Sequence, residues 1–212
     1  IINDVDDWKF EERLSKEFEA VGFFISDHPL NQFTEIFDDY KIKDFSHFNS
    51  SDDIKDANIA ATLLKVQERK TAKGNSYAVL KLTDLTSVFE LFIFSDILEL
   101  NRETLIEGNS LILTLVKSIS SDENRFKRIN VQKIASLKDL FNSPINEVSF
   151  DVKTNEEVNE ISKLLNENGK TTVNINLKTD DKILKFKLKN TRNLDRKSLN
   201  LLRKREISST IS

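Results

Sequence analysis

The chain has 212 residues, of which 38% are hydrophobic and 32% charged, and its formal net charge is −3 at pH 7. This length exceeds one typical domain, and the composition favours packed cores over disorder. The absence of Cys excludes disulfides, thiolate nucleophiles and cysteine-based zinc sites, and it fits a cytoplasmic origin. No apolar run approaches the roughly 20 residues that cross a bilayer, so we expect no membrane partner.

The beginning of the chain and its charge distribution are also informative. It begins with Ile1-Ile2 and contains no Met, so we expect a piece of a longer polypeptide. Residues 1–56 hold 6 Lys and Arg against 15 Asp and Glu, residues 57–140 hold 12 against 10, and residues 141–212 hold 14 against 10. An acidic head followed by neutral-to-basic parts suits a chain whose later parts meet polyanions.

Residues 1–45 are predicted to be helical. Apolar residues recur at helical spacing from Trp8 to Phe24, and Asp6 or Asp7 is a suitable N-cap. A second helix is expected after Pro29, because Pro is favoured at the first helical position. Its apolar face would consist of Phe33, Ile36, Phe37 and Tyr40.

The next segment, from Phe45 to Asp56, is rich in Ser and Asp and is interpreted as a linker. From Ala57 the apolar period changes to two, which indicates strands. The predicted elements are a strand around Ile59–Leu63, a hairpin loop at Arg69–Asn75, strands at Tyr77–Leu82 and Val88–Phe94, a helix at Asp96–Ile106, and strands at Leu111–Ile119 and Phe126–Ile134. Five strands with one helix between the third and the fourth predict a β-barrel of the OB type over residues 55–140. The main competitor is an SH3-like barrel, which usually lacks that helix.

The tail, residues 141–212, is predicted to form a separate small α+β domain in the order β-α-β-β-α. Its elements are strand Val148–Val152, helix Asn155–Asn168, strands Thr172–Leu177 and Ile183–Leu188, and helix Asp195–Arg205. The predicted fold class is therefore α+β and multidomain, with a helical N-terminal segment over residues 1–54, a five-stranded OB barrel and this C-terminal domain.

Candidate catalytic groups are few. Asp4 and Asp6 have the spacing of a paired-carboxylate metal site, but they precede a helix among polar neighbours, which favours a capping or solvated role. His28 and His47 are the only histidines, and we expect His28 to cap the helix that follows it. The four glycines are scattered, so no phosphate-binding loop is present. We therefore expect no catalytic residue, metal or cofactor in this chain.

The predicted barrel contains a candidate binding surface. If Ala78, Leu80 and Leu82 point inward, the alternation of strand residues places Tyr77, Val79 and Lys81 outward, together with Val88, Glu90 and Phe92 of the next strand. Exposed rings can stack on bases, and cations can neutralise phosphates. The candidate nucleic-acid-binding residues are Lys65, Arg69, Lys70, Lys73, Tyr77, Lys81, Phe92, Arg125, Lys127 and Arg128. The alternatives are that Phe92 is covered by a neighbouring domain and that the Lys-rich hairpin is only solvated.

The last predicted helix is basic and is the candidate surface for a partner. The candidate residues are Lys197, Leu201, Arg203 and Lys204. Contact with DNA, contact with an acidic partner and a merely solvated face are all compatible with this pattern.

Several short motifs follow one another in a fixed order. They are Glu19–Gly22 followed by two Phe residues, Ser26–Pro29, Thr71–Gly74, Leu82–Asp84 and Glu90–Phe94. Together they resemble the C-terminal part of the alpha subunit of bacterial DNA polymerase III. The resemblance is dense over residues 11–95 and rests after residue 137 on element order and Gly169 alone. Asp27 and Ser87 stand where the family has Gly.

The resemblance implies a division of labour. Residues 1–54 would connect to the polymerase body, residues 55–140 would hold single-stranded template DNA, and residues 141–212 would bind the tau subunit of the clamp loader. The Asp residues and the Mg²⁺ of the parent DNA-directed DNA polymerase would lie outside this chain, as would the motif that binds the sliding clamp. The location implied is the bacterial cytoplasm, at the nucleoid.

Two other functions remain compatible with the residues alone. One is a pure assembly module whose barrel packs on protein. The other is an anticodon-binding OB domain of a tRNA synthetase, which leaves the helical head and the tail unexplained.

Overall fold

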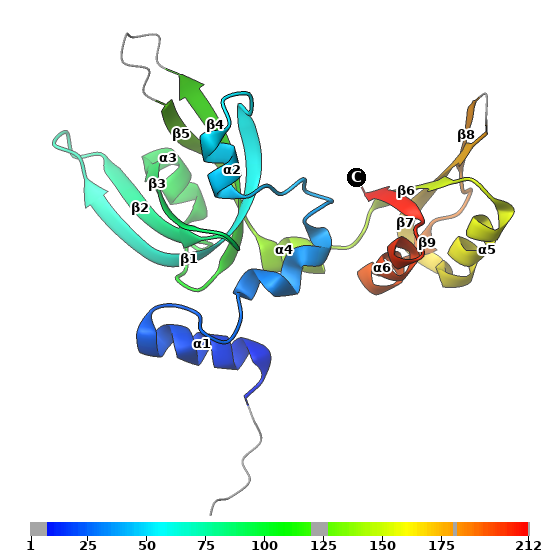
Figure 1. Cartoon of the computed structure of the whole chain (residues 1–212), viewed down its shortest axis with the longest axis horizontal. Coiled ribbons are helices and arrows are strands. Elements are labelled where there is room, and N and C mark those ends of the chain that lie inside the picture. Colours follow the sequence, from blue (N-terminus) through cyan, green and yellow to red (C-terminus); the bar gives the residue numbers. More distant parts are fainter. Residues whose placement is uncertain (1–7, 120–126, 180–181, 212) are drawn as a thin grey trace, which may run out of the picture. The chain divides into compact units, whose positions relative to one another are not determined.

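A computed structural model describes residues 8–119, 127–179 and 182–211 (Figure 1). The chain forms two compact units, one up to residue 141 and one from residue 142 onward. Both are of mixed α/β type, and each contains one five-stranded sheet. Among the described residues, no helix is both long enough and apolar enough to span a membrane.

The first unit begins with two helical elements. Helix α1 spans Phe10–Val21 and ends at Gly22, whose φ of 76° is the left-handed conformation that glycine adopts without strain. Element η1, Pro29–Ile36, is a 3₁₀ helix with Pro at its start. His28 is its N-cap, since its Nδ1 accepts a hydrogen bond from the N–H of Leu30, as expected. The caps predicted at Asp6 and Asp7 lie outside the described residues.

The prediction of a linker after Phe45 is wrong. Helix α2 spans Phe45–Ser50, and the side chain of Phe48 is fully buried. The ring of Phe45 stacks on that of Phe89 with centroids 3.8 Å apart. Phe45 and Phe48 are three residues apart and thus lie on one face of a helical turn, which the surrounding Ser and Asp residues obscured in the sequence.

Five strands of the first unit form one antiparallel sheet. They are β1 (Asp56–Lys70), β2 (Ser76–Thr83), β3 (Val88–Phe94), β4 (Ser110–Ile119) and β5 (Lys127–Ser136), and helix α3 (Ser95–Asn101) lies between β3 and β4. The element order is as predicted, and the sheet order is β3-β2-β1-β4-β5. Strand β1 extends to Lys70, further than predicted, and carries a bulge between Leu63 and Lys65. Closure of the sheet into a barrel stays a prediction.

The two faces of this sheet differ in what covers them. The inner face carries the main core, whose fully buried side chains include Ile59, Leu63, Leu80, Leu82, Ile93, Leu111 and Leu113. On the outer face, Ala60 and Ile112 lie opposite each other and pack against η1 and α4 (Leu137–Asn142) in a second apolar cluster. This cluster also includes Ala135 of β5 but no residue of β2 or β3, whose outer face carries both buried Val79 and exposed Phe92.

The second unit has helices and one sheet. Its elements are β6 (Glu147–Val152), α5 (Asn155–Leu164), β7 (Asn166–Lys178), β8 (Ile183–Lys187), β9 (Arg192–Asn193), α6 (Arg196–Lys204) and β10 (Ser208–Ile211). The sheet order is β10-β6-β7-β8, with β9 paired to β7. The short strands β9 and β10 were not predicted, and α5 ends at Leu164 rather than Asn168. Gly169 lies so close to the backbone of Arg192 that no side chain would fit there.

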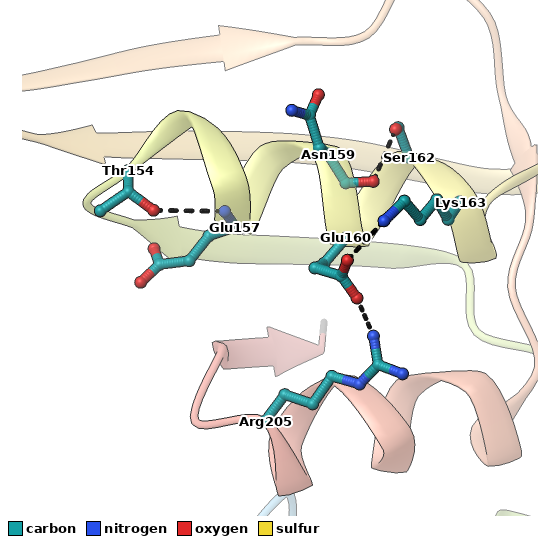
Figure 2. Close-up of polar contacts among 7 residues, drawn as sticks. All are labelled: Thr154, Glu157, Asn159, Glu160, Ser162, Lys163 and Arg205. Atoms are coloured by element: carbon teal, nitrogen blue, oxygen red, sulfur yellow. Dashed lines mark hydrogen bonds and ion pairs between the residues drawn. The ribbon is translucent and has the colours of Figure 1, made fainter.

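Polar contacts cap helix α5 and connect it to the end of α6 (Figure 2). The hydroxyl of Thr154 accepts from the N–H of Glu157 at 3.2 Å and so caps α5. Glu160 forms an ion pair with Lys163 at 2.6 Å and a second one with Arg205, which follows α6. Glu160 thus links α5 to the end of α6.

Candidate nucleic-acid interface

The outer face of β1, β2 and β3 presents its side chains in rows, because directly paired residues of neighbouring strands point to the same side. Leu80 and its neighbours Ala78 and Leu82 point into the core, as predicted. The opposite parity gives three rows on the outer face. From β1 to β3 these are Arg69–Tyr77–Phe94, Gln67–Val79–Phe92 and Lys65–Lys81–Glu90.

The first two rows contain an aromatic surface. Phe92 is 54% exposed and Phe94 is 47% exposed, while Tyr77 is half-buried between them and β1. The guanidinium of Arg128, on β5, lies 5.1 Å from the centroid of the Phe94 ring, a cation–π distance. Phe94 was not among the predicted site residues, although its parity with Phe92 would have identified it.

The third row is cationic and lies beside the aromatic surface. Lys65 and Lys81 are directly opposite each other on β1 and β2, and both are exposed. Like charges in this position destabilise a sheet, and Glu90 on the other side of Lys81 offsets part of the repulsion. A bound anion between the two ammonium groups would relieve the remainder.

The predicted loop cations have different surroundings. Lys70 and Lys73 are exposed at the β1–β2 hairpin, and Arg69 donates to the side-chain oxygen of Gln67 at 2.9 Å. Arg125 lies outside the described residues, and for Lys127 only its place at the start of β5 is described. The structure therefore brings Arg69, Tyr77, Phe92 and Arg128 to one surface, beside Lys65 and Lys81.

A groove of about 960 Å³ borders the cationic row, between the sheet and the segment from α1 to η1. Lys65, Lys81 and Lys138 contribute cations to its lining. Its acidic lining residues are Glu19, Glu103, Glu107 and Asp139. Because the acids outnumber the cations, the groove does not favour phosphate.

The titratable groups of the first unit serve its structure. Burial lowers the pKa of His28, and the nearby carboxylates of Asp84 and Asp27 oppose that shift. The pKa of Glu17 is lowered by hydrogen bonds from the hydroxyl and N–H of Ser26 and from the N–H of Ile25. Within the ranges that the structure describes, no group of three or more His, Asp or Glu residues could hold a metal ion.

The predicted partner surface lies on α6 in the second unit. Lys197, Leu201 and Lys204 are exposed and spaced four and three residues apart, so they form one outward stripe. Arg203 differs, because it is half-buried and donates to the hydroxyl of Ser209 at 2.9 Å. Its guanidinium therefore joins α6 to β10 and is less available to a partner than the other three side chains.

Comparison with known proteins locates the chain in a family. No protein-family model matches it. It is similar to proteins named DNA polymerase III subunit alpha: 33% identical over 151 residues to that of Rickettsia conorii, covering 70% of the chain, and 26% over 216 aligned residues to that of Borreliella burgdorferi, covering 93%. The chain spans only 12% and 18%, respectively, of the lengths of these relatives. These matches confirm the resemblance carried by the motifs: over the matched part of its length, the chain belongs to the family of bacterial DNA polymerase III alpha subunits.

Proposed function

We propose that the first unit is an OB-type barrel that binds single-stranded DNA through the outer face of β1, β2 and β3. The observation that carries the proposal is the row of Tyr77 and Phe94 with Arg128 stacked on the ring, beside the opposed pair of Lys65 and Lys81. The sheet order β3-β2-β1-β4-β5 is the strand order of an OB fold opened between β3 and β5. The contact between Phe94 on β3 and Arg128 on β5 supports closure there.

The chemistry of this face suits a single strand better than a duplex. Aromatic rings stack on unpaired bases without regard to sequence, and each stacked base contributes about 1–3 kcal/mol. Lysines beside the rings neutralise phosphates and make the affinity fall with salt. Val79, which pairs with Phe92, is only 9% exposed, so the surface available to bases consists of the rings themselves. We expect modest, salt-sensitive binding that depends little on base sequence.

The parent protein of such a chain would be a replicative DNA-directed DNA polymerase in the bacterial cytoplasm. Family membership supports DNA replication as its setting. Its catalytic carboxylates, its Mg²⁺ and the motif for the sliding clamp would lie outside this chain. The chain itself would hold the template near the polymerase body and connect it to the rest of the machine.

We expect Phe94→Ala to weaken oligo(dT) binding by about tenfold, because the variant loses one stacking ring and the cation–π contact that positions Arg128. Lys81→Glu should weaken binding at low salt and reduce the slope of log K against log salt by about one unit or more. Fluorescence anisotropy across a salt series measures both quantities.

The matched control is Leu100→Ala, which shortens another exposed apolar side chain, on α3 and outside the three rows of the proposed site. It should bind DNA as the wild type does. If the unaltered chain fails to bind oligo(dT) even at low ionic strength, the DNA proposal is excluded and a purely protein-binding first unit takes its place. The exposure of Val88, at the far end of β3, is the feature that would favour that second function.

The second unit, we propose, binds the tau subunit of the clamp loader through the stripe Lys197–Leu201–Lys204. An apolar side chain between two lysines is a small surface with an apolar centre and a charged rim. We expect Leu201→Ala to weaken capture by tau several-fold and Lys197→Glu with Lys204→Glu to abolish it.

Surface plasmon resonance with immobilised tau tests this expectation. Lys170→Glu, which reverses an exposed charge on β7, is the control and should bind tau normally. If the Leu201 and Lys197/Lys204 variants bind tau as tightly as the wild type does, α6 is not part of the tau interface.

A further inference from the structure

The second sheet ends in a strand with one free edge. In the order β10-β6-β7-β8, strand β8 pairs with β7 and, among the described residues, with no strand on its other side. Two of its large apolar side chains are unusually open: Ile183 is 54% exposed and Phe186 is 51% exposed. Figure 1 shows β8 as the outermost strand of this unit. A free edge offers unpaired N–H and C=O groups to another extended chain.

Two hydrogen bonds establish which backbone groups of β8 face outward. The N–H of Thr179 donates to the carbonyl of Lys182, and the N–H of Leu188 donates to the carbonyl of Val173, both at 2.9 Å. In an antiparallel pair, bonded and non-bonded residues alternate, so the even-numbered residues of β8 bond to β7. The N–H and C=O groups of Ile183, Lys185 and Lys187 therefore point away from the sheet, toward the free edge.

The charge along this edge has one sign. Residues 182–189 contain four lysines and no acidic residue. All four, Lys182, Lys185, Lys187 and Lys189, are exposed, and Lys185 lies near enough to Asp151 to contribute, after Lys178 and Asn176, to lowering the pKa of that carboxyl. Lys178, one strand inward, is by contrast paired with Asp151 at 2.7 Å. The edge thus carries a net positive charge, only part of which is compensated, beside exposed apolar side chains.

We propose that β8 binds an extended acidic segment of a partner protein as a further strand of the second sheet. The alternation of β8 predicts the pattern of that segment. Lys185 and Lys187 lie opposite Asn176 and Asn174 on the polar face of the sheet, whereas Leu184 and Phe186 lie opposite Leu177 and Ile175 on the apolar face. An added strand with acids on the first face and apolar residues on the second would match both, by the cross-strand pairing that stabilises sheets.

The lysines also determine which kinds of strand can pair with the free edge of β8. Lysine on an edge strand commonly prevents edge-to-edge association, because like charges brought directly opposite one another are destabilising. A second copy of β8 would bring lysines against lysines and is disfavoured. An acidic strand meets no such repulsion, so the same residues select for it. This surface is separate from the stripe on α6, and the proposal stands whether or not tau binds there.

The direct test uses the full chain and a short fluorescent peptide that alternates Glu and Val. We expect the peptide to bind at low salt, and a peptide of the same composition with its Glu and Val residues in two blocks to bind at least about tenfold more weakly. Equal binding of the two peptides would show that the chain recognises only the charge of the peptide and not its alternating pattern, and this would overturn the added-strand proposal. Absence of binding at low salt would also overturn it.

A pair of substitutions at one position separates backbone pairing from charge. Lys185→Gln removes one charge and should weaken peptide binding a few-fold. Lys185→Pro removes the same charge and also the outward N–H, while leaving the bonds to β7 in place, since proline is tolerated at the free side of an edge strand. We expect it to lower the affinity by at least a further factor of about ten.

Folding and competing occupants are checked in the same variants. Thermal unfolding followed by circular dichroism should be nearly unchanged for Lys185→Pro. If it is not, Phe186→Ser with Lys187→Glu replaces it as the test variant, and unchanged peptide binding by that variant would sink the proposal. Leu201→Ala, on α6, should bind the peptide normally. Concentration-dependent dimerisation that Lys185→Pro abolishes would instead assign the edge to a second copy.

Discussion

Phe48→Ala is expected to destabilise the first unit by about 3–5 kcal/mol. The ring is fully buried in the main core beneath the five-stranded sheet. The ammonium nitrogen of Lys117 lies 4.4 Å from the centroid of this ring. The same ammonium group donates hydrogen bonds to the carbonyls of Phe48 and Ser51. Truncation would therefore leave a cavity and remove the cation–π contact that holds α2 on β4.

Urea denaturation monitored by circular dichroism measures this loss. Phe48→Leu should cost less, since most of the buried volume is kept, and His47→Ala, an exposed neighbour on the same helix, should be near neutral. A Phe48→Ala variant as stable as the wild type would mean that the packing of α2 against the core does not stabilise the first unit.

Asp84→Ala is expected to destabilise the first unit by about 3 kcal/mol. The side chain is buried, and one carboxylate oxygen accepts from the N–H of Phe45 at 2.7 Å. The other accepts from the N–H and hydroxyl groups of Thr86 and Ser87. One acid thus closes the β2–β3 turn and attaches the start of α2, and its removal leaves buried donors unpaired.

The same carboxylate predicts a pH dependence. Burial raises the pKa of Asp84, but the hydrogen bonds from Phe45, Thr86 and Ser87 outweigh it and lower the net pKa below the ordinary value of 3.8. A folded-state pKa below the unfolded one contributes stability above the unfolded pKa. That contribution disappears as the pH falls through the unfolded value toward the folded one.

Asp84→Asn provides the measurement. It keeps one acceptor oxygen but cannot ionise, so the difference in free energy of unfolding between it and the wild type should be larger at pH 7 than at about pH 3. Glu99→Ala, an exposed acid on α3, should show no such convergence. A wild-type advantage that is equal at both pH values would exclude the ionised carboxylate as its source.

Most of the element order could be predicted, because the evidence for it is local. Alternation along β2 placed Leu80 inward and Lys81 outward without any knowledge of the sheet, and Pro29 marked the start of η1. The sequence motifs also sufficed for the family, as the relatives of the chain confirm.

Other features could not be predicted, because they depend on partners far away in the chain. Strands β9 and β10 are too short to show a period, and they exist through pairing with β7 and β6. Helix α2 resembled a linker because its few apolar residues gain meaning only when Asp84, 39 residues after Phe45, and Lys117, 69 residues after Phe48, lie beside it. Loop-closing contacts of this kind leave no local pattern.

By itself, then, the sequence determined most of the longer strands and helices, which side of β2 is apolar, and the family to which the chain belongs. Only the tertiary structure decided that Arg128 stacks on Phe94, that η1 and α4 pack on Ala60 and Ile112, and that β8 ends its sheet with four lysines in and beside it. Periodicity and capping act between neighbours a few residues apart, whereas strand order and surface juxtaposition follow from packing of the whole chain.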